Sequence, residues 1–372
     1  ARPTANWTCD DGNTTCVYRQ TTRTGPLRLR QELRLGRSDP TSLLDTVTSG
    51  AFTDGTLRFG FVPAGPGATV VRGDRRVRSL PRRRHRAGGR VVTTLAATDH
   101  GVASNRAGPP VRLAWERFGG DGVPLLLING LGSPSVAFEA GFIRELLDRD
   151  CSVVRFDNRD TGRSDRCPDH AYSLAEMAAD AVAVMDAAGW ETAHVLGQSM
   201  GGMIAQQVAV DHPERVDSLI SFMATTGNPA VGRPSADAIR ALLIEQPADH
   251  DGWLDHRVET ERIWASPDHW DPDWVRAKGR AMYEHGVDPR GTVRQFRAIA
   301  SSGNRDEALG GLSLPVLVLH GTADTLITPS GGEHTAAVIP GATFVAVDGL
   351  GHDLPPPRWA EIAGLITRFV EP

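Results

Sequence analysis

Short apolar runs alternate with helical patterns over residues 93–372, and this alternation limits the fold more than any other feature. Each run ends in glycine or another turn residue, as a buried strand does. The runs are residues 123–130, 151–158, 193–196, 215–223, 314–321 and 343–349, with an earlier alternating segment at 110–119. Strands that alternate with helices form a mostly parallel sheet covered on both faces. The sequence therefore predicts an α/β fold with a doubly wound sheet.

One stretch interrupts this alternation. Between residues 226 and 305 the pattern is helical and broken, and it includes four tryptophans within about two dozen residues. An insertion of this kind between two strands predicts a helical cap. We interpret the tryptophans as cap core, with one or two lining an apolar pocket as the alternative.

Residues 1–92 have a different character and are assigned to a basic N-terminal extension of unknown role, which leaves 93–372 as the main domain. They hold 17 arginines against 7 acidic residues, although the whole chain has a net charge of −5. Segments 27–35 and 55–62 alternate well enough for short strands. The arginine-rich stretch 72–90 has no periodic apolar face, and we favour a solvated linker over an arm that binds RNA or a membrane surface.

Composition narrows the class of protein further. With 40% hydrophobic and 23% charged residues, the chain is typical of a globular protein, and no run approaches the ~18 apolar residues of a membrane span. We expect a cytoplasmic location and no nucleic-acid or membrane partner; secretion and the oligomeric state stay open. The four cysteines lack zinc-site spacing, and pairing of Cys9 with Cys16 is left open.

The stretch 193–206 contains a candidate nucleophile, Ser199, within the pattern G-x-S-x-G. A short strand candidate precedes it and a helical pattern follows. This is the context of a nucleophile elbow, in which a sharp strand-to-helix turn exposes the serine. A turn serine between glycines is the competing interpretation.

A serine hydroxyl needs a base, and the base needs a group that fixes its tautomer. Asp324 and His352 both follow apolar runs, so each is expected on a loop after a strand. Their order after Ser199 is that of the Ser-Asp-His triad. Asp348 and Asp353 are rival candidates for the acid, and capping of the last helix is the alternative role of His352.

A developing oxyanion needs two backbone N–H donors. Met200 N–H follows the nucleophile directly, and Leu131 N–H lies in the loop 129–132, where glycines flank it. Two further groups of polar residues are given other roles. Arg159, Asp160 and Arg163 are expected to hold the loop after their strand, and the histidines 194, 320 and 334 have no companions that would form a metal site.

Five ordered motifs resemble the α/β-hydrolase family over residues 93–372: LLLINGLGS, VVRFDNRDTGRSD, LGQSMGGMIAQ, VLVLHGTADTLITP and GLGHDLP. The RFDNRDTGRSD and GHDLP blocks are similar to the actinobacterial esterases that include the aclacinomycin methylesterases. Asn129 departs from the family, since many relatives have histidine there. The resemblance implies an α/β-hydrolase fold and a serine esterase.

The predicted function is a serine hydrolase, without a cofactor or metal, that cleaves a small-molecule carboxylic ester or lactone through an acyl-enzyme. On the same fold, cofactor-free perhydrolysis of the haloperoxidase type, C–C bond hydrolysis and acyl transfer are alternatives. A binding module with an idle triad is the alternative from a different class of protein.

Overall fold

The computed structural model describes residues 4–9, 15–24, 27–36, 95–105 and 109–371 of the chain. By its internal contacts the chain divides into two units, Ala1–Leu57 and Arg58–Pro372. The predicted strand at 55–62 and the arginine-rich stretch 72–90 lie outside the described residues. The boundary between residues 92 and 93 therefore stays a prediction.

The first unit contains a three-stranded antiparallel sheet in the order β1-β2-β3. Its strands are β1 (Thr4–Cys9), β2 (Thr15–Thr24) and β3 (Leu27–Gly36). The last of these matches the strand predicted at 27–35. The register pairs the backbone of Cys9 with that of Cys16.

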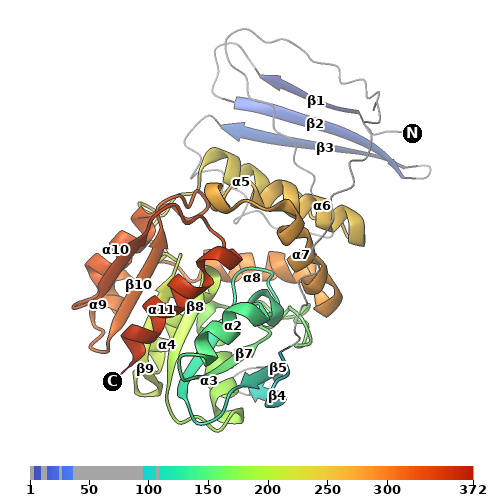
Figure 1. Cartoon of the computed structure of the whole chain (residues 1–372). Coiled ribbons are helices and arrows are strands. Elements are labelled where there is room, and N and C mark those ends of the chain that lie inside the picture. The colour runs from blue at the N-terminus through green and yellow to red at the C-terminus, as the bar shows by residue number, and fades with distance from the viewer. Residues whose placement is uncertain (1–3, 10–14, 25–26, 37–94, 106–108, 372) are drawn as a thin grey trace, which may run out of the picture. The chain divides into compact units, whose positions relative to one another are not determined.

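The second unit contains an eight-stranded sheet in the order β11-β10-β9-β8-β6-β7-β5-β4 (Figure 1). From β11 to β7 all neighbours are parallel, and β5 and β4 are antiparallel additions at one edge. The strands are β4 (Asp99–Asn105), β5 (Val111–Phe118), β6 (Val123–Ile128), β7 (Cys151–Phe156), β8 (Ala193–Gln198), β9 (Val216–Phe222), β10 (Val316–Gly321) and β11 (Thr343–Val347). The predicted doubly wound sheet is confirmed.

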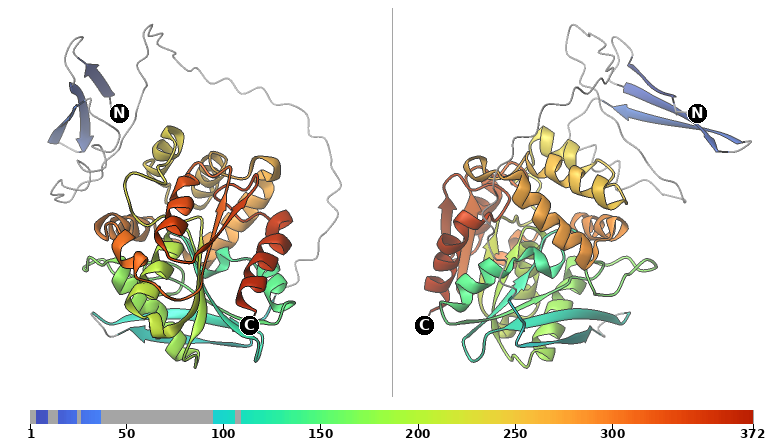
Figure 2. Two further views of the ribbon diagram at one scale, coloured as in Figure 1. Left: turned by 90° about the vertical axis from the view of Figure 1, so that its left-hand side faces the viewer. Right: turned by 45° about the vertical axis from the view of Figure 1, so that its right-hand side comes forward.

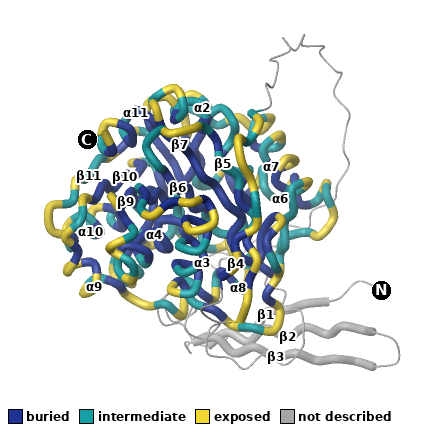
Figure 3. The backbone as a smooth tube through the Cα atoms, turned by 90° about the horizontal axis from the view of Figure 1, so that it is seen from below, coloured by how far each residue is buried: buried dark blue, intermediate teal, exposed yellow. Residues whose placement is uncertain are grey.

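Helices cover both faces of this sheet. On one face α2 (Ala140–Leu147) and α11 (Trp359–Val370) pack against each other and share an apolar core with the strands. The other face has the larger core, formed with α3 (Leu174–Ala187), α4 (Met200–Asp211), α9 (Asp306–Gly310) and α10 (Ser330–Val338). The central strands β6 and β7 are buried along most of their length (Figure 3). The predicted capping box of Ser173 and Glu176 begins α3.

Four α-helices and one short 3-10 helix, Pro267–His269, follow one another between β9 and α9, where the sequence predicts a helical cap (Figure 2). The α-helices are α5 (Ala236–Leu242), α6 (His250–Glu261), α7 (Pro272–Gly286) and α8 (Pro289–Ser301). Trp253, Leu254 and Met282 form a small apolar core of their own. Of the four cap tryptophans only Trp253 is fully buried, so the interpretation as cap core holds for that residue. Among the described residues, no helix has the length and apolar character needed to cross a membrane.

Candidate active site

Ser199 lies on the sharp turn between β8 and α4, as the elbow pattern predicts. Its backbone has φ +59° and ψ −122°, a region that residues with a side chain rarely occupy. The flanking glycines make the turn possible. A Cβ on Gly197 would overlap the carbonyl of Gly201, and a Cβ on Gly201 would overlap the carbonyl of Ile128. The turn therefore needs glycine at both positions and places Ser199 at the amino end of α4.

The structure brings Ser199, His352 and Asp324 together from three loops. His352 Nε2 lies 2.9 Å from Ser199 Oγ, and His352 Nδ1 lies 2.6 Å from Asp324 Oδ2. An ionised carboxylate can only accept, so Nδ1 donates to Asp324 and Nε2 is left to accept the serine proton. The histidine and the acid follow β11 and β10, whose carboxyl ends lie near that of β8 in the parallel part of the sheet.

Asp324 is buried and ionised. Its Oδ1 accepts from the backbone N–H groups of Leu326 and Ile327, at 2.8 and 2.9 Å. Burial raises the pKa of this carboxyl, but the charge of His352 and hydrogen bonds from His320 and His352 lower it more, to about 2. No metal site is predicted at His320, and its sequence context indicates no other role. Its Nε2 donates to Ile327 O at 2.8 Å and lies 3.4 Å from Asp324 Oδ2.

The two rival acids have other partners. Asp348 accepts from the Thr322 hydroxyl on an exposed loop. Asp353 is buried and accepts from the backbone N–H and the hydroxyl of Ser266, at 3.0 and 2.5 Å. Neither of them bonds to His352 in the described part of the chain. Asp324 is thus the acid that contacts the histidine.

The loop of residues 129–132, called the oxyanion loop below, lies against the elbow. A Cβ on Gly130 would come within 3.2 Å of Ser199 Cβ. Within the described residues, neither Met200 N–H nor Leu131 N–H donates to a protein acceptor. Met200 N–H also begins a helix, where the dipole favours negative charge. Met200 follows Ser199 directly and Leu131 follows Gly130, the residue that lies against Ser199, so the assignment of both N–H groups to an oxyanion stays a prediction.

Two of the three residues predicted to hold the loop after β7, Arg159 and Asp160, do so through side-chain contacts. Arg159 forms a buried ion pair with Asp180, at 2.6 Å. Asp160 accepts from Tyr172 Oη at 2.7 Å and forms an ion pair with Arg294 of the cap at 2.6 Å. Arg163 contributes its backbone N–H to Asp157.

The cap contacts the site loops through its backbone and side chains. His352 N–H donates to Trp264 O at 2.6 Å, and Thr325 Oγ1 donates to Ile263 O at 2.8 Å. On its other side, His285 lies 2.8 Å from Asp157 Oδ2. Sequence reasoning missed these contacts, because they join segments that are far apart in the chain.

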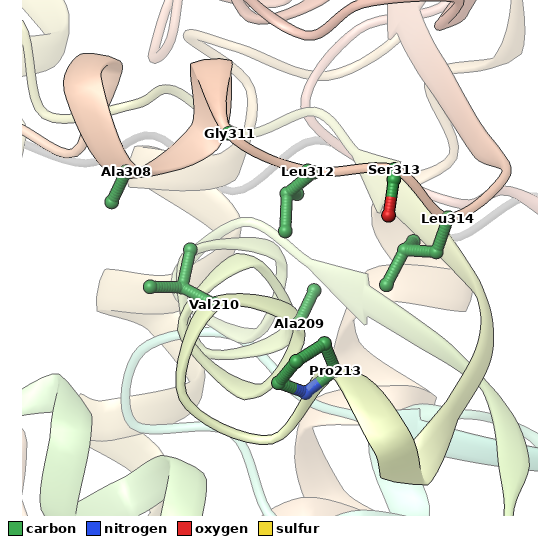
Figure 4. A pocket seen from close by; sticks show the side chains of 8 residues that line it. All are labelled: Ala209, Val210, Pro213, Ala308, Gly311, Leu312, Ser313 and Leu314. Atoms are coloured by element: carbon green, nitrogen blue, oxygen red, sulfur yellow. The ribbon is translucent and has the colours of Figure 1, made fainter.

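A hollow of about 350 Å³ lies elsewhere on the molecule, between the end of α4 and the chain that leads into β10 (Figure 4). Its lining is Ala209, Val210, Pro213, Ala308, Gly311, Leu312, Ser313 and Leu314. These residues lie at the amino ends of the strands, whereas the triad follows their carboxyl ends. Among the described residues, no group of three or more His, Cys, Asp or Glu side chains is arranged to bind a metal ion.

Comparisons with known proteins agree with this arrangement. A family model described as the alpha/beta hydrolase fold matches residues 123–356. The rhodomycin D methylesterase DnrP of Streptomyces peucetius is 32% identical over 256 residues, which cover 62% of this chain and 85% of that protein. A putative carbamate hydrolase, RutD of Variovorax paradoxus, is 31% identical over 213 residues, which cover 56% of this chain and 76% of that protein.

The fold itself recurs in solved structures. The esterase RhEst1 of Rhodococcus superposes with a TM-score of 0.62 at 24% identity, covering 73% of this chain and 99% of that one. The family match covers more than half of the chain and includes the elbow, the oxyanion loop and both triad partners of Ser199. The chain therefore belongs to the α/β-hydrolase fold family.

Proposed function

We propose that this chain is a serine esterase in which Ser199, His352 and Asp324 form the catalytic triad. Its membership of the α/β-hydrolase family, together with its two methylesterase relatives, makes it a hydrolase that acts on ester bonds. What we propose in addition are the catalytic roles of Ser199, His352 and Asp324. The observation that carries them is the continuous chain of contacts from Ser199 Oγ through His352 to Asp324, at 2.9 and 2.6 Å.

The proposed cycle uses only groups of this chain, the ester and water. Ser199 Oγ attacks the ester carbonyl while His352 Nε2 takes the serine proton. The carbonyl oxygen becomes an oxyanion that Met200 and Leu131 N–H groups stabilise. His352 then gives its proton to the leaving alkoxide, which departs as an alcohol. Water, deprotonated by the same imidazole, attacks the acyl-enzyme. The imidazolium then returns this proton to Ser199 Oγ as the acid leaves.

Asp324 supports both halves of this cycle. Its carboxylate holds Nδ1–H of His352, which keeps Nε2 free to accept a proton, and it stabilises the imidazolium that forms in each step. Because the pKa of Asp324 is lowered to about 2, the carboxylate stays charged throughout the neutral range.

The proposed substrate is a small carboxylic ester, with a methyl ester as the first choice. Two relatives at 32% and 31% identity are named methylesterases, which favours a small leaving alcohol. Carbamates are the second candidate, because the same nucleophile and oxyanion donors act on their carbonyl and a relative is named a carbamate hydrolase. A cytoplasmic location and the absence of nucleic-acid or membrane partners stay predictions from composition.

A substrate panel tests the proposal. We expect the purified chain to hydrolyse p-nitrophenyl esters of increasing acyl length, and methyl esters of aromatic acids, with no added metal or cofactor. Ser199→Ala should abolish turnover of each. Lactones, phenyl carbamates, and hydrogen peroxide as an alternative acyl acceptor complete the panel. Preference for carbamates would select the second candidate, and a folded chain that cleaves no ester would reject the proposal.

A further inference from the structure

Gln295 lies on the cap helix α8 and connects the cap to the oxyanion loop. Its side chain is fully buried. Gln295 Oε1 accepts from the backbone N–H of Gly132 at 2.8 Å, and Gln295 Nε2 donates to the carbonyl of Arg159 at 2.7 Å. Gly132 and Gln295 are 163 positions apart in the chain. One amide thus joins the cap, the oxyanion loop and the loop after β7.

The oxyanion loop is held on both sides of Leu131. Ser133 N–H donates to Gly130 O at 3.2 Å, which closes a four-residue turn with Leu131 as its second residue. Before Leu131, the carbonyl of Asn129 accepts from Asn158 Nδ2 at 3.1 Å. After Leu131, the N–H of Gly132 is held by Gln295. Leu131 N–H lies between these two anchors.

The anchor at Gly132 adds to the turn hydrogen bond as a restraint on this part of the loop. Gly132 has φ +64°, and without a Cβ this residue can adopt many other backbone angles. Gln295 holds the peptide between Leu131 and Gly132, and the Leu131 N–H belongs to the peptide before it. Because the Asn129 carbonyl is held on the other side, release of Gly132 would remove one of the two restraints that flank the Leu131 N–H. An oxyanion donor works only if it is aimed at the developing charge before the reaction begins.

We propose that Gln295 is a positioning residue for this reaction, which fixes the direction of the Leu131 N–H by holding the next peptide of the oxyanion loop. The inference rests on the proposed function, because it assigns Leu131 N–H to the oxyanion. It also makes the cap a part of the catalytic apparatus and not only a cover for the substrate.

Gln295→Met tests this, since methionine is similar in length to glutamine and has neither amide group. We expect kcat/KM for the best p-nitrophenyl ester to fall about ten- to hundredfold, as small errors in donor geometry cost rate. Affinity for a trifluoromethyl ketone with the same acyl chain should fall by a similar factor, because its adduct with Ser199 carries an oxyanion. Affinity for the matching ether, which has no carbonyl, should stay unchanged.

Gln206→Met is the matched control. Gln206 is also fully buried and hydrogen-bonded, to Ser221 at 3.0 Å and to Arg305 at 3.2 Å, and among the described residues it forms no hydrogen bond with the oxyanion loop. This variant should lose thermal stability and keep the ratio of ketone to ether affinity. The inference is overturned if folded Gln295→Met keeps the wild-type kcat/KM, or if both variants change that ratio equally.

Two further results separate the possible failures. If Gln295→Met does not fold, Gln295→Lys takes its place, because a lysine ammonium keeps a donor for the Arg159 carbonyl and has no acceptor for the Gly132 N–H. The same selective loss of ketone affinity is expected, and unchanged affinity would overturn the inference. If the wild type shows no Ser199-dependent turnover, the proposed function fails and the inference fails with it. If the wild type shows Ser199-dependent turnover and substitution of Gln295 changes neither kcat/KM nor ketone affinity, the inference is rejected and the proposed function is kept.

Discussion

Ser199 has a strained backbone and a hydroxyl that contacts His352, and the residues around it hold both in place. The positive φ angle is tolerated because Ser199 N–H donates to Phe222 O at 2.9 Å and the elbow is packed on both sides. Its hydroxyl contacts His352, which is fixed in turn by Asp324 and by the cap carbonyl of Trp264. Strain of this kind persists only where the surroundings determine it, and it is concentrated at functional sites.

Asp324→Asn should lower kcat by about 10³–10⁴-fold, since an amide would hold the wrong tautomer of His352. Asp348→Asn, its control on an exposed loop, should leave kcat unchanged. Ester turnover measured from about pH 5 to about pH 9 checks both variants. Titration of Asp324 itself should add no pH dependence to wild-type turnover over this range, because the pKa of Asp324 is lowered to about 2 and its carboxylate is charged throughout.

The lowered pKa of Asp324 also predicts how the free energy of unfolding changes with pH. Folding favours the charged form of Asp324, so its ionisation stabilises the native state above the unfolded pKa of about 4. This contribution is lost as the pH falls through about 2. A difference in unfolding free energy between wild type and Asp324→Asn that grows as the pH falls below about 4 would contradict this account.

Among the elements, the strands of the parallel sheet are the part that sequence predicts well. The apolar runs that become β6, β7 and β10 are buried along most of their length. Their apolar composition alone therefore identifies them as buried strands. The edge strand β4 was not predicted, because only two of its seven residues are buried and its sequence has little apolar alternation. The contact of Gln295 with Gly132 depends on how the cap packs against the rest of the unit, and no local sequence pattern predicts that packing.

At the junction of β8 and α4, Gly201→Ala should destabilise the protein by about 3 kcal/mol, because the added methyl group would overlap the backbone of β6. The control is Gly189→Ala, which has φ +73° but no atom within 4 Å of an added Cβ. That change should cost only about 1 kcal/mol, from the backbone angle alone. Urea unfolding of both variants measures the difference, and equal costs would mean that the close approach of α4 to β6 is not needed.

On the scale of the whole molecule, the residues that we propose for catalysis all lie within the second unit. The triad and the two oxyanion donors all lie between residues 129 and 352, inside the family match. The order of the motifs predicted the α/β-hydrolase fold and indicated which residues to propose as the triad, since each motif follows a strand that can be recognised locally. The substrate could not be predicted in the same way, because the cap is interrupted and its packing depends on contacts with four separate loops.

Removal of residues 1–92 should therefore leave Ser199-dependent ester turnover unchanged. The measurement is kcat and KM of the shortened chain beside those of the full chain, with salt varied to detect any contribution of the arginine-rich stretch. A large loss of kcat in a folded, shortened chain would assign the first 92 residues a part in catalysis and would contradict the interpretation as a linker.

The most direct test of the central claim is covalent labelling with a fluorophosphonate. We predict that the folded chain gains the mass of one phosphonyl group, that peptide mapping locates this group on Ser199, and that His352→Ala slows the labelling severely while Ser199→Ala abolishes it. A folded chain that is not labelled, or that is labelled equally after Ser199→Ala, would contradict the account.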